Sequence, residues 1–267
     1  MIGCVPHQDT QDPQDTQTPD AEERLPGGNT GGAVRVGDSV RRPAGPWTPA
    51  VQLLLAHLRA RGVTEVPEPR GVDDRGRDVT AFVPGTVPAY PMPAWVWADH
   101  VIAEAAALLR RVHDASADLD TAGLVWRLPA REPAEVVCHS DAAPYNLVFT
   151  DGHVVGLIDW DTAAPGPRVW DLAYLAYRLA PLGPAAADPE DVPLVERARR
   201  LALLCAAYGR GVRERDVLVA VPGRLRALAD HTRARAAGSP ELRAHADAYT
   251  ADAAWVEGAT EALLAAP

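Results

Sequence analysis

The first third of the chain carries short stretches in which apolar and polar residues alternate. Residues 33–36 and 39–42 are two extended runs separated by Gly-Asp, a dipeptide typical of tight hairpin turns. Residues 69–72 and 78–83 form a second pair of runs around a turn rich in Asp and Gly. The pattern predicts a small β-rich unit built from two hairpins.

A helical pattern separates the two hairpins. Thr48 is expected to cap the helix, with a proline at the first helical position, and Gly62 is expected to end it. Between them the apolar residues recur at the spacing of one helix face, at Val51, Leu54, Leu55 and Leu58. We therefore expect one amphipathic helix within the β-rich unit.

From Ala94 onward the apolar residues recur with a helical period. Helices are predicted over residues 99–113, 172–179, 194–208, 216–236 and 241–265. Pro222 lies inside the fourth of these, so a kink or a break is expected at the residue before it. Apolar runs broken by turns lie between the first two helices, at residues 136–139, 147–149 and 154–158.

The order of these elements predicts an α+β fold class and three segments. Residues 1–23 are polar and acidic, and they have too few large apolar side chains to offset the entropy of ordering, so a disordered tail is expected. Residues 24–86 then form a small β-rich N-lobe, and residues 87–267 form a larger helical C-lobe.

Composition and charge exclude several classes of protein. No run approaches the roughly 18 apolar residues of a membrane span, and the N-terminus lacks an apolar signal-peptide core, so a cytoplasmic protein is expected. Six of the acids lie within residues 1–23, and the rest of the chain carries 30 acids against 26 arginines. A mildly acidic body of this kind is a poor nucleic-acid binder. The chain contains no lysine.

The three cysteines are far apart and odd in number, at Cys4, Cys138 and Cys205. Their spacing argues against a disulfide framework and against a zinc-type site. Cys138 lies in an apolar run and is expected to be a buried thiol.

The segment from Val136 to Tyr177 carries the residues suited to phosphoryl transfer. Asp141 and Asn146 are five residues apart in a loop between two apolar runs, and Asp159 follows a third. Transfer of a phosphoryl group from a nucleotide requires oxygen ligands for a divalent metal and a carboxylate that orients the acceptor hydroxyl. Asp141 suits the second role, while Asn146 and Asp159 suit the first.

This segment resembles the aminoglycoside phosphotransferase family, a group of protein-kinase-like enzymes that phosphorylate small molecules. The family pattern is His-Gly-Asp, four residues, Asn, and then Ile-Asp-Trp or Ile-Asp-Phe, with an Asp-Leu-Ala signature downstream. The matching residues here are His139-Ser140-Asp141, Asn146, Ile158-Asp159-Trp160 and Asp171-Leu172-Ala173. The resemblance implies a two-lobe kinase-like fold, with Asp141 as the catalytic residue and Asn146 and Asp159 as ligands of Mg²⁺.

Neighbours of these three residues have less certain roles. We expect His139 to support the loop and Asp171 to act as a buried brace or a helix cap rather than as a metal ligand. Two interpretations of Asp161 stay open, a contact within the site and a solvated acid. Ser140 replaces the family glycine with another small residue.

The residues that would bind the nucleotide are predicted from weaker signals. The glycine-rich run at residues 27–32, with Gly28 and Gly31, is a candidate phosphate-covering loop, although a plain linker is nearly as good an interpretation. By the resemblance, the strand around Ala81 and Val83 would offer backbone groups to the base of ATP or GTP.

The chain departs from the family pattern where that family places a strand lysine and a helix glutamate. There is no lysine, and the helix after Thr48 offers Gln52 and His57 but no acid. Arg42 or Arg41 on the second strand is the expected replacement. Arg42 is preferred because it alternates with Val40 on one face, and a surface arginine on an edge strand is the competing interpretation for each.

The sequence thus predicts a Mg²⁺- and nucleotide-dependent O-phosphotransferase acting on a hydroxyl of a small molecule, with no protein partner evident. An aminoglycoside-like antibiotic is one candidate acceptor. A non-catalytic kinase-like module that binds a nucleotide or metabolite is the alternative. Acids near the C-terminal helices are either acceptor contacts or solvated residues: Glu190, Asp191, Asp230, Glu241, Asp247 and Asp252.

Overall fold

The computed structural model describes residues 21–25, 32–186 and 192–267. Most of the expected tail therefore lies outside the described residues, as do Gly28 and Gly31 of the glycine-rich run. The boundary of the tail at residue 23 is wrong, because Glu23 and Arg24 form strand β1 and pair with Arg35 and Val34. The sheet thus begins inside the segment that was expected to be disordered.

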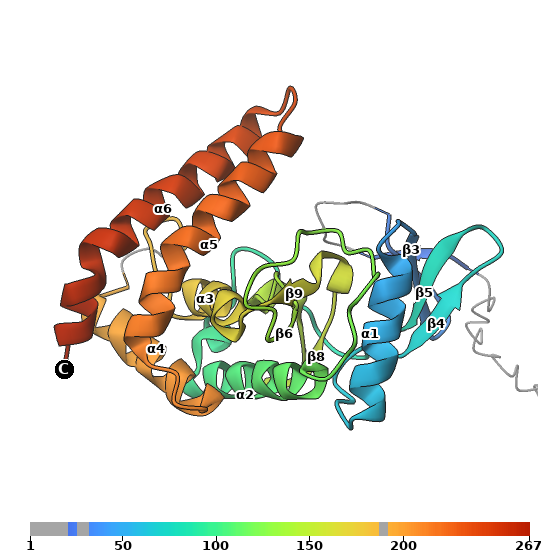
Figure 1. Cartoon of the computed structure of the whole chain (residues 1–267), viewed down its shortest axis with the longest axis horizontal. Coiled ribbons are helices and arrows are strands. Elements are labelled where there is room, and N and C mark those ends of the chain that lie inside the picture. The colour runs from blue at the N-terminus through green and yellow to red at the C-terminus, as the bar shows by residue number, and fades with distance from the viewer. Residues whose placement is uncertain (1–20, 26–31, 187–191) are drawn as a thin grey trace, which may run out of the picture.

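The N-lobe is a five-stranded antiparallel sheet with one helix beside it. Its strands lie in the order β1-β2-β3-β5-β4. Their bounds are Glu23–Arg24 (β1), Val34–Val36 (β2), Ser39–Pro43 (β3), Pro69–Val72 (β4) and Arg77–Ala81 (β5). Helix α1, Thr48–Ala60, connects the two hairpins, and Figure 1 shows it alongside the sheet. Both predicted hairpins and the predicted helix are present.

The N-cap of α1 is one residue earlier than expected. Trp47 takes the cap position, and Pro49 lies in the first turn. Thr48 instead accepts a hydrogen bond on its Oγ1 from the backbone N–H of Gly45, at 3.0 Å. The Thr48 side chain therefore fixes the turn that leads into the helix rather than capping the helix itself.

Gly85 is at the crossing between the two lobes. The chain there runs so close to strand β7 (Leu147–Thr150) that a Cβ atom on Gly85 would lie 2.6 Å from the carbonyl oxygen of Phe149. The φ of Gly85, +142°, is itself a conformation that favours glycine. Directly after it, Thr86 exchanges two backbone hydrogen bonds with Phe149, of 2.8 and 2.9 Å. The N-lobe is thereby attached to a C-lobe strand by main-chain bonds.

The C-lobe contains five α-helices, among the described residues, and two small two-stranded sheets. The helices are α2 (Asp99–Ser116), α3 (Arg168–Leu179), α4 (Leu194–Tyr208), α5 (Glu214–Arg235) and α6 (Pro240–Ala265). One sheet pairs β6 (Val136–Cys138) with β9 (Ala164–Gly166), and the other is a hairpin of β7 (Leu147–Thr150) and β8 (His153–Leu157). Figure 1 shows α5 and α6 as a long antiparallel pair that extends away from the other helices.

The break expected at Pro222 is absent, because α5 is one continuous helix from Glu214 to Arg235. Pro222 is itself buried, and it lies between the buried residues Val221 and Leu225. Burial of this face against the rest of the C-lobe offsets the backbone hydrogen bond that a proline in a helix interior gives up. Tertiary packing thus overrides the local signal.

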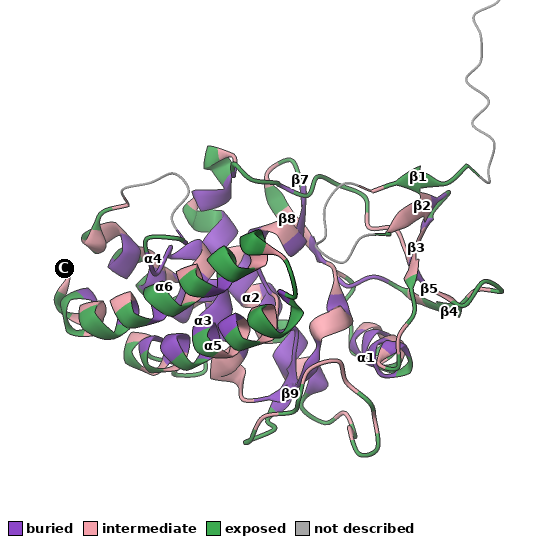
Figure 2. Ribbon diagram, turned by 90° about the horizontal axis from the view of Figure 1, so that it is seen from above, coloured by how far each residue is buried: buried purple, intermediate pink, exposed green. Residues whose placement is uncertain are grey.

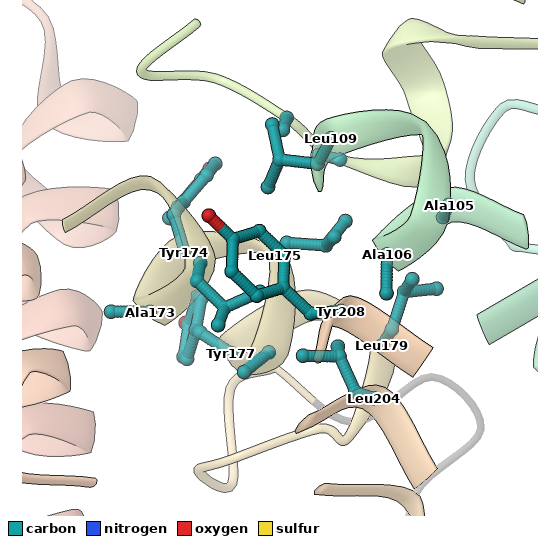
Figure 3. Packing of buried hydrophobic residues seen from close by; sticks show 14 of the residues in the cluster. Ala105, Ala106, Leu109, Ala173, Tyr174, Leu175, Tyr177, Leu179, Leu204 and Tyr208 are labelled. Carbon is teal, nitrogen blue, oxygen red and sulfur yellow. The ribbon is translucent and has the colours of Figure 1, made fainter. Parts of the chain in front are cut away.

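The core lies mainly in the C-lobe. Figure 2 shows the buried residues concentrated on the facing sides of α2, α3 and α5, whereas the N-lobe strands are largely half-buried or exposed. Figure 3 shows how Ala106 and Leu109 of α2 pack close to Leu175 of α3 and to Leu204 and Tyr208 of α4. The rigid part of the molecule is therefore the helical lobe that carries the loops described below.

No helix in the described part of the chain is long and apolar enough to cross a membrane. Cys138 is buried, as expected from its apolar surroundings.

We expect Leu109→Ala to lower the free energy of unfolding by about 2–5 kcal/mol, because it leaves a cavity in a packed core. Leu109 is 1% exposed at the contact between α2, α3 and α4. Urea denaturation measures the change. Leu53→Ala is the matched control, since Leu53 is 45% exposed. Equal losses in the two variants would contradict this placement of the core.

Candidate active site

A single buried carboxylate holds the loop that follows β6. Asp171, in the first turn of α3, accepts hydrogen bonds from the backbone N–H of His139 (2.7 Å) and of Ser140 (2.8 Å). His113 of α2 contacts the same carboxylate through Nε2 at 3.1 Å, and its Nδ1 lies 2.8 Å from the hydroxyl of Tyr208. Three helices thus fix the loop from behind, which is the bracing role expected for Asp171.

His139 supports the loop from within. Its Nε2 donates to the carbonyl oxygen of Ile158 at 2.9 Å, and its Nδ1 accepts the backbone N–H of Asp141 at 3.2 Å. A ring that donates through one nitrogen and accepts through the other is a neutral imidazole. His139 therefore joins the strand end before Asp159 to the loop that carries Asp141, and its reactive nitrogens are both occupied.

The serine in place of the family glycine has a backbone cost. Ser140 has a φ of +65°, a left-handed conformation that glycine adopts freely and that costs other residues of order 1 kcal/mol. The two hydrogen bonds to Asp171 and a contact from Arg224 to the Ser140 carbonyl oxygen hold it there. The replacement is thus more than an exchange of one small residue for another.

Asp141 lies in the cleft between the lobes with both carboxylate oxygens oriented. Tyr145 donates its hydroxyl to Oδ1 at 3.0 Å, and the side-chain amide of Asn146 donates to Oδ2 at 2.9 Å. Burial raises the pKa of Asp141, and the nearby charge of Asp159 adds to the rise, while the hydrogen bond from Tyr145 opposes it. A carboxylate in this setting is more basic than an exposed one.

Asn146 and Asp159 present oxygens that suit a hard divalent cation. The Asn146 amide nitrogen is bound to Asp141 through two bonds, of 2.8 and 2.9 Å, which leaves its oxygen facing away from Asp141. Asp159 has a φ of +63° at the end of β8, and its side chain is 37% exposed to the cleft. An amide oxygen and a carboxylate in one cleft are ligands that Mg²⁺ accepts, so the residues fit that ion.

Arg42 reaches across the cleft from the N-lobe. Its guanidinium group contacts Asp159 at 2.9 Å, Asp161 at 3.0 Å and Asp78 at 3.2 Å. Gln52 of α1 donates its amide to the same Asp78. Arg41, by contrast, faces Asp73 at 3.7 Å on the β4–β5 turn. Of the two candidates, Arg42 is the one on the cleft side, and Asp78 is its acidic partner within the N-lobe.

The cleft has a volume of about 1370 Å³ and is lined by both lobes. Ala81 and Val83 line it on the N-lobe side. The backbone N–H of Ala81 is already bonded to the Glu68 carbonyl oxygen at 2.8 Å, whereas no described residue bonds the backbone of Val83. Val83 therefore offers a free backbone position to a planar, hydrogen-bonding ligand.

Sequence reasoning missed several residues in or next to the cleft. Asp78, which contacts Arg42, is a buried acid within strand β5, and an acid at an inward strand position is the signal that could have marked it. Arg127 pairs with Asp161 at 3.5 Å from a long loop after α2. Arg178 and Arg224 line the cleft from α3 and α5, and nothing in their local sequence distinguishes them from surface arginines.

The acids proposed as acceptor contacts do not line the cleft where the structure describes them. Asp230 and Asp247 are exposed and pair with Arg233. Asp252 is buried, and its carboxylate accepts hydrogen bonds from the Tyr177 hydroxyl (2.8 Å) and the Ala185 N–H (3.1 Å). Glu241 is exposed outside the cleft, and residues 190 and 191 lie outside the described residues.

Comparison with known proteins decides the family. A model of the phosphotransferase enzyme family matches residues 117–211, the region that contains Asp141, Asn146 and Asp159. A trifolitoxin immunity protein from Rhizobium leguminosarum bv. trifolii is 32% identical over 209 residues, which cover 73% of this chain and 77% of that protein. The chain belongs to the phosphotransferase enzyme family. Membership confirms the predicted resemblance and the prediction of a small-molecule kinase.

Solved structures of other phosphotransferases share the fold. A choline kinase from Cryptosporidium parvum has a TM-score of 0.63 at 11% identity, with 95% of this chain and 93% of that chain covered. A spectinomycin phosphotransferase solved with ADP and spectinomycin has a TM-score of 0.57 at 10% identity, with coverages of 90% and 93%. These similarities confirm the kinase-like α+β fold with a small sheet lobe and a helical lobe.

We expect Asp171→Asn to lower the free energy of unfolding by about 3 kcal/mol at neutral pH, because it removes the buried charge that holds two backbone amides. Burial would raise the pKa of Asp171, but contacts with His113 and His139 hold it below its ordinary value. The stabilisation is therefore present above about pH 4 and is lost as the pH falls through the lowered pKa.

Urea denaturation at neutral pH and at several pH values below 4 measures this difference. The difference in the free energy of unfolding between the parent and Asp171→Asn should become smaller in acid. Asp151→Asn, at an exposed turn, serves as the control. A difference that stays constant with pH would show that the carboxylate charge is not what holds the loop.

Proposed function

We propose that this phosphotransferase transfers the γ-phosphoryl group of ATP or GTP to a hydroxyl group of a small molecule, with Mg²⁺ as the metal. The observation that carries the proposal is the placement of Asp141, Asn146 and Asp159 along one cleft, with Arg42 opposite them. These are the parts that phosphoryl transfer requires, and they converge from segments far apart in the chain.

Asp141 would orient the acceptor hydroxyl and take up its proton as the hydroxyl oxygen bonds to the γ-phosphorus and the bond to the diphosphate leaving group breaks. Tyr145 and Asn146 hold its carboxylate in one orientation, which favours this role. The raised pKa of Asp141 makes it a better proton acceptor than an exposed aspartate.

Asn146 and Asp159 would hold Mg²⁺, which when bound neutralises charge on the donor phosphates. Arg42 would take the phosphate contact that a strand lysine makes in relatives, since its forked guanidinium group suits phosphate oxygens. Val83 would offer its backbone to the nucleobase. That a spectinomycin phosphotransferase of this fold was solved with ADP supports a nucleotide as the donor.

A second candidate function is immunity to a toxin, by phosphorylation or by binding alone. Its support is the identity of 32% with a trifolitoxin immunity protein, over 73% of this chain and 77% of that protein. The cleft, at about 1370 Å³, also exceeds the roughly 300–1,000 Å³ typical of small-molecule sites. The non-catalytic binding module remains a form of this candidate, and it would bind nucleotide without transferring phosphate.

We expect Asp141→Ala to reduce phosphoryl transfer by a factor of about 10² or more, as removal of a general base does. Mass spectrometry of a panel of hydroxylated acceptors, incubated with ATP-Mg or GTP-Mg, measures the transfer. Asp74→Ala is the control, because Asp74 lies exposed on the β4–β5 turn. Circular dichroism should show an intact fold, and full activity in Asp141→Ala would refute the assigned role.

We expect Arg42→Gln to weaken binding of Mg-nucleotide by about tenfold, because a charge-assisted phosphate contact is lost. A ligand at 100 times its Kd stabilises the native state by roughly 2.7 kcal/mol, so the melting temperature reports binding. Arg41→Gln is the matched control on the opposite face of the strand. Equal nucleotide-dependent shifts in both variants, or no shift in the parent, would contradict the donor site.

A further inference from the structure

The acceptor side of the cleft is lined by cations rather than by acids. Among the described residues, the acids that line the cleft are Asp141, Asp159 and Asp161, and all three are at its catalytic end. Apart from Arg42 on the N-lobe side, the remaining charged lining residues are arginines: Arg127, Arg131, Arg178, Arg224 and Arg235. His231 and His245 line the same region. An acceptor that enters there meets positive charge.

Four of these arginines have no carboxylate within 4 Å among the described residues, namely Arg131, Arg178, Arg224 and Arg235. Arginines elsewhere on the C-lobe behave differently. Arg199, Arg226 and Arg233 each pair closely with an acid. Positive charge in the cleft is thus left without a partner, although the surface of the same lobe has acids available.

Arg224 is the most buried member of this group. It is 4% exposed, lines the cleft, and its Nε has no hydrogen-bond partner. A buried guanidinium N–H without an acceptor is costly, so the hydrogen bonding of Arg224 is incomplete in the protein alone. Its other contact is with the carbonyl oxygen of Ser140, the residue before Asp141. The unsatisfied donor therefore lies beside the catalytic carboxylate.

Aromatic rings connect Arg224 to two more of these arginines. The guanidinium carbon of Arg131 lies 3.7 Å from the centre of the Trp170 ring, and that of Arg224 lies 5.6 Å from it. Arg224 also lies 4.5 Å from the centre of the Tyr174 ring, and Arg178 lies 5.5 Å from it. Guanidinium groups and rings alternate along the wall, and the rings hold the cations without neutralising them.

Arg178 occupies an aromatic cluster that could otherwise receive a cationic acceptor. Its guanidinium carbon lies within 6 Å of the ring centres of Tyr145, Tyr174, Tyr177 and Tyr249. Asp252 is the nearby acid, and it is engaged by the Tyr177 hydroxyl rather than by Arg178. The protein's own cation fills the place where these rings would bind an ammonium group.

The positive charge of these arginines also affects His231 on α5. The pKa of His231 is lowered, first by burial and then by the charges of Arg235, Arg127 and Arg224. Positive charges therefore converge on this region from two elements, the loop after α2 and helix α5.

From these observations we infer that the acceptor carries an oxyanion, a carboxylate or a phosphate-like group, which binds between Arg224 and Arg131 next to the hydroxyl that is phosphorylated. The inference rests on the proposed function, since it names the class of acceptor for the same cleft. It disfavours a polycationic aminoglycoside, which would meet unneutralised arginines in place of acids.

Inorganic phosphate and malonate serve as probes for the site, without Mg²⁺ or nucleotide and at constant ionic strength. Each anion should raise the melting temperature of the parent protein in a saturable way. Arg224→Gln and Arg131→Gln should raise the apparent Kd by about tenfold, while Arg224→Lys should retain part of the binding. Stabilisation by phosphate alone would assign a phosphate-like group, and stabilisation by malonate as well would assign a carboxylate.

Arg243→Gln is the matched control, because Arg243 lies exposed on α6 outside the cleft. Phosphate stabilises many proteins by exclusion from their surface, so the comparison between variants decides the result. Arg131→Gln keeps the test valid should the buried Arg224→Gln variant fail to fold. Kanamycin, a polycation, should give no stabilisation.

Three outcomes would overturn the inference. In the first, the anions stabilise the parent, Arg131→Gln and Arg243→Gln equally. In the second, the stabilisation by anions is lost only in Arg42→Gln, which places the anions at the donor site. In the third, kanamycin stabilises the parent and the anions do not. Stabilisation by Mg-ATP or Mg-GTP is measured separately on the same protein. Failure of the proposed function, with no nucleotide shift, is therefore distinguishable from failure of the oxyanion site.

Discussion

The arrangement of the cleft depends on the buried carboxylate of Asp171. It accepts the backbone N–H groups of His139 and Ser140 and contacts His113, so the main chain before Asp141 is bound to α2 and α3. A further main-chain bond connects this loop to the segment before Asp159, because Ile158 donates its N–H to the Asn146 carbonyl oxygen. A reactive loop is thereby held by a rigid helical core without burying its own reactive side chains completely.

Two attachments of different kinds connect the lobes. At one, Thr86 and Phe149 share backbone hydrogen bonds at the close crossing that Gly85 permits. At the other, Arg42 bridges the N-lobe sheet to Asp159 and Asp161 of the C-lobe. The first depends on the main chain alone. The second is electrostatic and involves the same carboxylate that is proposed to bind metal, so ligands compete directly with the contact between the lobes.

The sequence predicted the elements well where one local signal dominated. The hairpins, α1 and the C-lobe helices follow from apolar period and turn residues, and the spacing of Asp141, Asn146 and Asp159 indicated their convergence. Prediction failed where the outcome depends on distant packing. Pro222 does not interrupt α5 because its helix face is buried. The arginines that line the cleft were missed, because Arg224 and Arg178 become cleft residues only when α3 and α5 pack together. No local sequence pattern encodes that packing.

The absence of lysine has a consequence for how the cleft responds to its surroundings. A guanidinium group stays protonated up to a pH above about 12, whereas an ammonium group begins to discharge near pH 10. Among the described residues, the cations of arginine or lysine type that line this cleft are therefore guanidinium groups alone. Reagents that acylate primary amines would likewise find no side chain to modify in this cleft, since the whole chain offers them none. The lack of an amine in the cleft is thus a property of the composition of the chain.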